Sequence, residues 1–304
     1  MELGLHLPHI GPTATRDGVL EVARAADAAG IDSLWASDHV IVPRDYASTY
    51  PYSPSGKMPI PEDAPFLEAV STLLAVCGVT RRARLGTSVL VLPQRQPVLV
   101  AKQWATLDVL SGGRTIFGAG AGWLEEEFAA LGVPFKGRGG RCDEALDILQ
   151  RCWKESTVTF QGKHFQIDGI ACEPKPIQQP RPPIWIGGHT PAAFRRVARY
   201  GDAWHGGGTV EVCRAARDAV RAEAEKIGRD PGMIELTIRD RGGLDVSTRE
   251  ARDQTIERLL PYAALGASHF LFLSFDTPEK VGETVRALQE EVKPALAAAG
   301  PSTS

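Results

Sequence analysis

The sequence is short of cysteines, long apolar runs and basic clusters, and each shortage excludes a class of protein. Five cysteines among 304 residues form neither a C-x-x-C pair nor a regular spacing, so a disulfide framework is not expected. The 34 lysines and arginines stand against 37 aspartates and glutamates, which disfavours nucleic acid and acidic membrane surfaces as partners. No apolar run is long enough to span a membrane, and none follows a basic N-terminal start. We therefore expect a reduced, cytoplasmic protein.

What the sequence does contain is a regular alternation of short buried strands with amphipathic helices. The expected strands cover residues 3–7, 33–36, 85–92, 114–117, 184–186, 202–204, 234–239 and 269–273. The expected helices cover residues 17–29, 66–79, 98–110, 141–153, 192–200, 212–227, 249–265 and 278–291. Eight such pairs without a linker predict a (β/α)8 TIM barrel, with residues 1–304 in one domain. A β-hairpin at 158–167 and an extended loop at 43–65, after the second strand, are the expected additions.

The strand–helix–strand unit at residues 84–127 is the expected centre of the binding site, because its strand ends are rich in glycine, serine and threonine. Small residues there let a flat or phosphorylated group approach the backbone. Gly118, Gly120 and Gly122 follow G-x-G-x-G spacing. A Rossmann dinucleotide fold is disfavoured, since its fingerprint is G-x-G-x-x-G followed by an acidic residue that is missing here.

In a barrel the chemistry lies at the carboxyl ends of the strands. That rule alone selects His9, Asp38, His39, residues 87–89, residues 118–123, residues 187–190, His205 and Arg239. Such residues also serve simply to satisfy loop backbones. No H-x-H or H-x-x-x-H spacing indicates a metal site, and residues 86–90 lack the second glycine of a hydrolase nucleophile elbow.

Six segments in the same order give the chain a family resemblance. They are SDH at 37–39, GTSV at 86–89, LSGGR at 110–114, GAGAGWLEEEF at 118–128, IWIGG at 184–188 and YGDAW at 200–204. Together they resemble the luciferase-like superfamily of flavin and deazaflavin oxidoreductases over the first two-thirds of the chain. The chain is most similar to the short, coenzyme F420-dependent branch, because the long monooxygenases carry insertions that it lacks.

The resemblance implies a set of cofactor-binding residues: Asp38, Thr87, Ser88, Val89, Gly118, Gly120, Gly122, Gly187, Gly188 and His189. In this family the third strand bulges behind the cofactor ring, which implies a cis peptide between Ser88 and Val89. Asp38 is expected to contact the polar edge of the ring. Gly187 and Gly188 open a helix and are expected to face the cofactor phosphate, where free backbone N–H groups favour an anion. An ordinary strand–helix corner is the alternative for the two glycines.

The expected substrate-binding residues are His9 and His205 at strand ends, Tyr46, Tyr50 and Tyr52 in the loop that projects above the barrel mouth, and Trp123. Trp123 stands where sugar-phosphate dehydrogenases of the superfamily have a glutamate, which favours a flat, apolar or aromatic substrate. The tyrosine-rich loop serves either as a lid over the site or as a dimer contact.

His39 is the expected proton donor, because the pKa of an imidazole lies near neutral pH. His9 and His205 are its rivals. Glu125 to Glu127 are expected to begin a helix that turns them away from the site.

The resulting hypothesis is an enzyme that transfers hydride between a reduced deazaflavin, coenzyme F420, and an organic substrate with a polarised C=C or C=N bond. An FMN-dependent luciferase-like monooxygenase is the close alternative. A non-catalytic flavin- or deazaflavin-binding protein is the alternative from another class. We further expect a homodimer, a small-molecule substrate and no metal.

Overall fold

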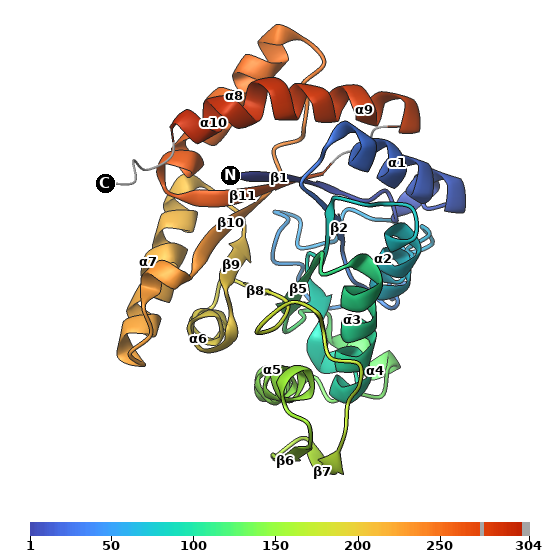
Figure 1. Cartoon of the computed structure of the whole chain (residues 1–304), viewed down its shortest axis with the longest axis vertical. Helices are drawn as coiled ribbons and strands as arrows, with labels where there is room; N and C mark the ends of the chain where they lie inside the picture. The colour runs from blue at the N-terminus through green and yellow to red at the C-terminus, as the bar shows by residue number, and fades with distance from the viewer. Residues whose placement is uncertain (274–276, 300–304) are drawn as a thin grey trace.

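The computed structural model describes residues 1–273 and 277–299 (Figure 1). Within these ranges a closed parallel sheet is formed by β1 (Glu2–His6), β2 (Ser33–Ala36), β3 (Arg84–Thr87), β4 (Leu90–Val91), β5 (Thr115–Gly120), β8 (Ile184–Gly187), β9 (Ala203–Gly206), β10 (Glu235–Asp240) and β11 (Ala267–Phe272). Because β3 and β4 are two halves of one strand, the sheet is an eight-stranded barrel, and pairing of β3 with β5 closes it. The predicted (β/α)8 barrel is confirmed.

Helices follow the barrel strands: α1 (Arg16–Ala29), α2 (Ala69–Cys77), α3 (Pro97–Ser111), α5 (Arg138–Lys154), α6 (Pro191–Tyr200), α7 (Val210–Lys226), α8 (Arg249–Ala264) and α9 (Pro278–Ala287). The last helix is broken, since a π-helical turn, η4 (Leu288–Val292), joins α9 to α10 (Lys293–Ala298). The expected hairpin is β6 (Val158–Gln161) paired with β7 (Gln166–Ile170). It lies at the opposite end of the molecule from α8 to α10 (Figure 1).

Local sequence signals set the ends of these helices. Thr15 caps α1 by accepting a hydrogen bond from the Gly18 amide, and Gly30 ends that helix in the left-handed conformation. Pro97 occupies the first turn of α3, where its missing N–H costs nothing. No described helix combines the length and apolar content that crossing a membrane requires.

The third barrel strand is interrupted at Ser88 and Val89, and the peptide between them is cis, as the resemblance implied. Before the break Gly86 pairs with Ile116, and after it Leu90 pairs with Ala119. Strand three therefore holds one more residue than the facing part of β5, which defines a bulge. The strand after the bulge is β4, so the expected strand at 85–92 is divided at the bulge that the resemblance implied.

β5 continues to Gly120, further than the expected strand at 114–117, because residues up to that glycine pair with β4 and β8. Gly118 lies so close to the bulged strand that an added Cβ would sit 1.7 Å from the Thr87 carbonyl oxygen. The Thr87 hydroxyl also donates to the Gly118 carbonyl oxygen at 2.7 Å. A glycine at this position is thus required by the contact between the two strands.

We predict that Gly118→Ala destabilises the barrel by at least about 1–3 kcal/mol, because a methyl group there forces the backbone of strand three to move. Gly282→Ala is the matched control: Gly282 lies inside α9, and its added Cβ would have only the Arg286 guanidinium as a neighbour, at 3.9 Å. This change should stabilise the protein by about 0.5–1 kcal/mol. Urea unfolding measures both, and equal stability of the two variants would contradict the packing argument.

Candidate active site

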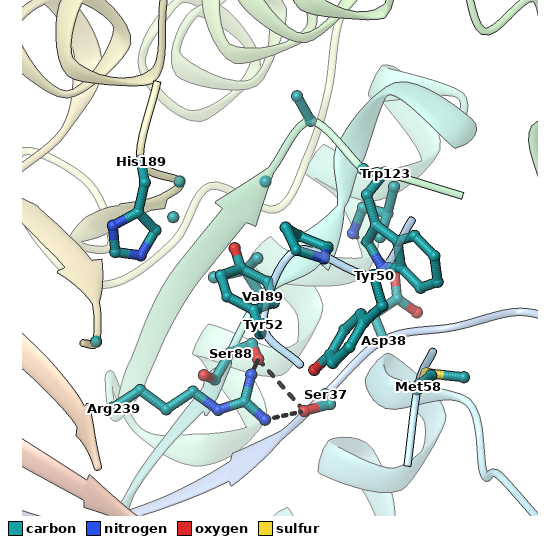
Figure 2. A pocket seen from close by; sticks show the side chains of 18 of the residues that line it. Ser37, Asp38, Tyr50, Tyr52, Met58, Ser88, Val89, Trp123, His189 and Arg239 are labelled. Atoms are coloured by element: carbon teal, nitrogen blue, oxygen red, sulfur yellow. Dashed lines mark hydrogen bonds between the residues drawn. The ribbon is translucent and has the colours of Figure 1, made fainter. Parts of the chain in front are cut away.

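A cavity of about 920 Å3 opens at the carboxyl ends of the barrel strands (Figure 2). Most of the residues expected in the site line it: Asp38, His39, Tyr50, Tyr52, Ser88, Val89, Gly120, Gly122, Trp123, Gly187, Gly188 and His189. They come from the bulge, from the last residues of β5 and β8, and from the segments that follow β2, β5 and β8. Segments far apart in sequence therefore meet at one end of the barrel.

Five of the expected residues do not line the cavity: His9, Tyr46, Thr87, Gly118 and His205. His9 is fully buried, and its ring nitrogens lie 2.9 Å and 3.0 Å from the carbonyl oxygens of Leu7 and Ser37. The expectation that His9 contacts the substrate is therefore wrong. Thr87 and Gly118 face each other between strands, one layer below the cavity surface. Tyr46 contributes only indirectly, packing edge-on against Trp123 at 5.8 Å.

His205 holds the bulge in place instead of contacting the substrate. Its Nδ1 lies 2.8 Å from the Thr237 hydroxyl, which itself donates to a carbonyl oxygen, so the imidazole donates at Nδ1. Its Nε2 then accepts a hydrogen bond from the Ser88 hydroxyl at 2.8 Å. Burial, aided by the charge of Arg239, keeps the pKa of His205 well below its ordinary value. The ring is neutral at physiological pH and suited to positioning Ser88.

Glycines create space for the Val89 side chain beside the bulge. A Cβ on Gly120 would lie 2.6 Å from Val89 Cγ2, and a Cβ on Gly187 would lie 3.2 Å from Cγ1. Larger residues at these positions would displace Val89 or fill the cavity next to it. The bulge and its neighbouring glycines thus form a cradle open enough for a flat ring, which is the shape of a flavin or deazaflavin.

Glu127 contacts His39, which corrects the expectation that residues 125–127 turn away from the site. His39 Nδ1 lies 2.9 Å from Glu127 Oε2, and the Val40 amide donates to Oε1 at 2.6 Å. Glu127 is 1% exposed. Burial opposes its ionisation, but hydrogen bonds, that from His39 foremost, lower its pKa overall. The ionised carboxylate fixes the proton on Nδ1 and leaves Nε2 of the cavity-lining imidazole available to a ligand.

The two preceding glutamates attach the long loop to α4 (Glu125–Ala130). Glu126 Oε1 accepts hydrogen bonds from the amides of Ala47 and Ser48 at 2.6 Å and 3.1 Å. The Ser48 hydroxyl accepts one from the Glu125 amide at 3.0 Å. The acidic run therefore anchors the loop that carries the site tyrosines.

Asp38 lines the cavity, but its carboxylate is engaged by the protein. One oxygen accepts from the Val91 amide at 2.8 Å, and the other from the Arg95 guanidinium at 2.7 Å. Burial raises the pKa of Asp38 despite these contacts. This side chain supports β4 just beyond the bulge. Both of its oxygens already accept hydrogen bonds from the protein, and the predicted contact with the cofactor ring would add to these.

Aromatic rings form one wall of the cavity. Tyr50 lies between Trp123 and Tyr52, with ring centroids 5.1 Å and 5.4 Å away, and His189 follows at 6.0 Å from Tyr52. Trp123 and His189 lie on opposite sides of the cavity (Figure 2). Arg241 secures the wall, since its guanidinium carbon lies 4.3 Å from the centre of the Tyr52 ring. Such a wall suits a flat or aromatic molecule.

The part of the cavity next to His189 suits an anion. Gly187 to Thr190 lead into α6, whose first turn is capped by Thr190, and Gly188 has a φ of +126° that favours glycine. In the first turn of this ten-residue helix Pro191 has no N–H, and the Ala193 amide donates to the Thr190 hydroxyl at 3.2 Å, which leaves the Ala192 amide for a ligand. Arg138 also lines this cavity. The arrangement fits the phosphate of a flavin-type cofactor.

The sequence alone missed Glu127 and Arg138 and did not assign a role to Arg239. Arg239 was named only because it stands at the end of a barrel strand, and that position does not indicate what its side chain does. The only signal for Glu127 was its place in an acidic run directly after the glycine corner. Its contact with His39 joins residues 88 positions apart, which sequence spacing does not reveal.

The fold and site define a (β/α)8 barrel whose bulged third strand lies beneath a cavity of about 920 Å3. The sequence matches the luciferase-like monooxygenase family over residues 3–300, and the chain belongs to this family. It is similar to an uncharacterized protein of Mycobacterium tuberculosis, with 39% identity over 211 residues, 69% of this chain and 72% of that protein. Its fold is that of the monooxygenase RslO1 from Streptomyces bottropensis, with a TM-score of 0.77 and 22% identity over 98% of this chain and 100% of that one.

Two named relatives depend on different cofactors. An F420-dependent glucose-6-phosphate dehydrogenase of Kineococcus radiotolerans is 30% identical over 242 residues, 77% of this chain and 66% of that enzyme. An FMNH2-dependent dimethylsulfone monooxygenase of Pseudomonas putida is 32% identical over 166 residues, 53% of this chain and 45% of that enzyme. The family thus contains both deazaflavin- and flavin-dependent oxidoreductases.

We predict that stability falls as the pH is lowered from 7 to 5, because His6 and His205 stay neutral in the folded protein. Burial is the main reason that the pKa of each lies well below 6.5. Below pH 6.5 the unfolded chain binds more protons than the folded one, so stability is lost with falling pH. Each histidine should account for about 2 kcal/mol at pH 5.

Urea unfolding at pH 7, 6 and 5 measures this loss. In His205→Asn the dependence of the unfolding free energy on pH should be smaller by about one proton. The variant should be less stable than the wild type at each of the three pH values. An unchanged slope in this variant would show that His205 is protonated in the folded protein as readily as in the unfolded chain.

Proposed function

We propose that the protein transfers hydride from reduced coenzyme F420 to an apolar or aromatic substrate with a polarised C=C or C=N bond. The observation that carries the proposal is the His39–Glu127 pair, which places a carboxylate-supported imidazole in the lining of a cavity floored by the strand-three bulge. Such a pair is suited to delivering a proton beside a bound ring.

The residues present fit a deazaflavin or flavin. Val89 at the bulge, with Gly120 and Gly187 beside it, leaves room for a flat ring. Arg138 and the glycine corner at Gly187 and Gly188, just before α6, would hold the cofactor phosphate. When bound, the reduced cofactor supplies a hydride, and the substrate atom next to the reduced carbon then requires a proton.

His39 is assigned the delivery of that proton from Nε2. The Glu127 carboxylate accepts the hydrogen bond from Nδ1 at 2.9 Å and fixes the orientation of the ring. Trp123 packs edge-on against His39 at 5.8 Å and offers an apolar surface to the substrate. Its indole does not act as an acid, so His39 is the proton donor in this arrangement.

An FMN-dependent monooxygenase is the second candidate, favoured by the similarity to the dimethylsulfone monooxygenase. A cofactor-binding protein without turnover is the third. The His39–Glu127 pair argues against the third, because mere binding of a cofactor gives no reason to orient a proton donor in this way.

We predict that the protein binds F420 more tightly than FMN. Fluorescence titration of the purified protein with each cofactor measures the preference, and oxygen consumption after adding reduced FMN tests for a monooxygenase. Tight FMN binding with rapid oxygen uptake and an oxygenated product would overturn the deazaflavin assignment in favour of the second candidate.

We predict that His39→Ala lowers kcat by about 10²- to 10⁴-fold and removes the pH dependence near neutrality, because the general acid is lost. F420 affinity should change little. Glu127→Gln should also lower kcat, since a neutral amide stabilises the imidazolium less well. His164→Ala, which removes a histidine of the β6–β7 turn, is the matched control and should retain kcat. A His39→Ala enzyme with normal kcat and pH profile would place the donor elsewhere.

A further inference from the structure

Arg239 at the end of β10 extends along one end of the cavity toward the bulge (Figure 2). Its Nη1 donates to the Ser88 carbonyl oxygen and its Nη2 contacts the Ser37 hydroxyl, both at 3.2 Å. Its Nε is buried and lacks a hydrogen-bond partner among residues 1–273 and 277–299. The guanidinium is thus held by neutral groups, while its buried Nε–H has no partner among the described residues.

No carboxylate balances this charge in the part of the chain that the structure describes. The titratable groups that act on Arg239 or are acted on by it are Arg241, Tyr50, Tyr52, His6, His9 and His205. Burial and Arg241 lower the pKa of Arg239 to about 10, so it remains a cation at neutral pH. A second cation, Arg241, stands on the same side of the cavity.

Two other enclosed arginines of this protein, Arg95 and Arg196, are neutralised by carboxylates. Arg95 bonds to Asp38 at 2.7 Å, and Arg196, which lines the same cavity, bonds to Asp143 at 2.7 Å. A buried charge without a partner is costly unless something else balances it. The difference between Arg239 and these two arginines indicates that its counter-charge comes from a ligand.

We propose that Arg239, assisted by Arg241, binds a negatively charged group in the cavity. Two sources share this chemistry: the anionic edge of the reduced cofactor ring, or a carboxylate on an aromatic substrate. The first source rests on the proposed function, whereas the second requires only the cavity. In either case Arg239 is a specificity-determining residue, and the substrate class narrows to aromatic acids if the second source is correct.

The first arm of the test uses the cofactor. Oxidised and reduced F420 are titrated anaerobically into the wild type, Arg239→Gln and Arg239→Lys. If the ring supplies the anion, Arg239→Gln should weaken binding of the reduced form by about 10-fold or more, and binding of the oxidised form by less than about twofold. Arg239→Lys should restore part of the preference, because it keeps the charge.

The second arm needs no cofactor, so it stands even if F420 does not bind. Benzoate and benzamide, which differ in charge but hardly in shape, are titrated against the tryptophan fluorescence of the cofactor-free protein. If the substrate supplies the anion, the wild type should bind benzoate about 10-fold more tightly than benzamide, and Arg239→Gln should lose this preference. Arg199→Gln removes an exposed arginine outside the cavity and should behave as wild type.

A preference for the charged ligand that Arg239→Gln loses supports the anion site. The arm in which it is found identifies the source of the anion. The proposal is overturned if the wild type prefers neither reduced over oxidised F420 nor benzoate over benzamide. This comparison uses only the wild type, so it remains decisive if Arg239→Gln fails to fold.

Discussion

The hydrogen bonds that hold Ser88 are the constraint on which the site depends. The Ser88 hydroxyl is bonded to His205 on β9, and its carbonyl oxygen to Arg239 on β10. Both partners come from strands on the far side of the barrel from β3. The Ser88 amide also donates to the Ala36 carbonyl oxygen of the neighbouring β2 at 2.8 Å, so the bulge is held both from across the barrel interior and from the adjacent strand.

Below the bulge, the barrel interior is filled by aromatic rings. Trp35 stacks on Trp185 with ring centroids 4.8 Å apart and on His205 at 5.5 Å. This packing closes the lower barrel and supports the imidazole that holds Ser88. Space for a ligand remains only above this layer, where glycines replace large side chains. The same stacking that stabilises the fold thus sets the depth of the cavity.

The alternation of strands and helices was sufficient to predict the barrel, because period and length of each element are local properties of the sequence. The family motifs located the bulge and the glycine cradle. The roles of the histidines were only partly predictable: His39 reaches the cavity, whereas His9 and His205 are buried beneath it. Whether a strand-end histidine reaches the cavity or is buried depends on the direction of its side chain. A shift of one residue along the strand reverses that direction.

Contacts between distant segments account for what the sequence did not reveal. Glu127 was expected to point away, yet it meets His39 because the loop after β2 folds back onto α4. Asp38 was expected at the cofactor, but Arg95 from the turn before α3 engages it. Neither pairing follows from a motif, since each requires the barrel to bring two strand-end loops together.

The central claim is that the cofactor ring rests on the Ser88–Val89 bulge, with its phosphate at the start of α6. A crystal structure of the protein with F420 bound tests this directly. The account predicts ring atoms in van der Waals contact with Val89 and a phosphate oxygen within hydrogen-bond distance of Arg138 or of a backbone N–H at the glycine corner that leads into α6. A ring bound away from the bulge, or a phosphate at another helix, would contradict it.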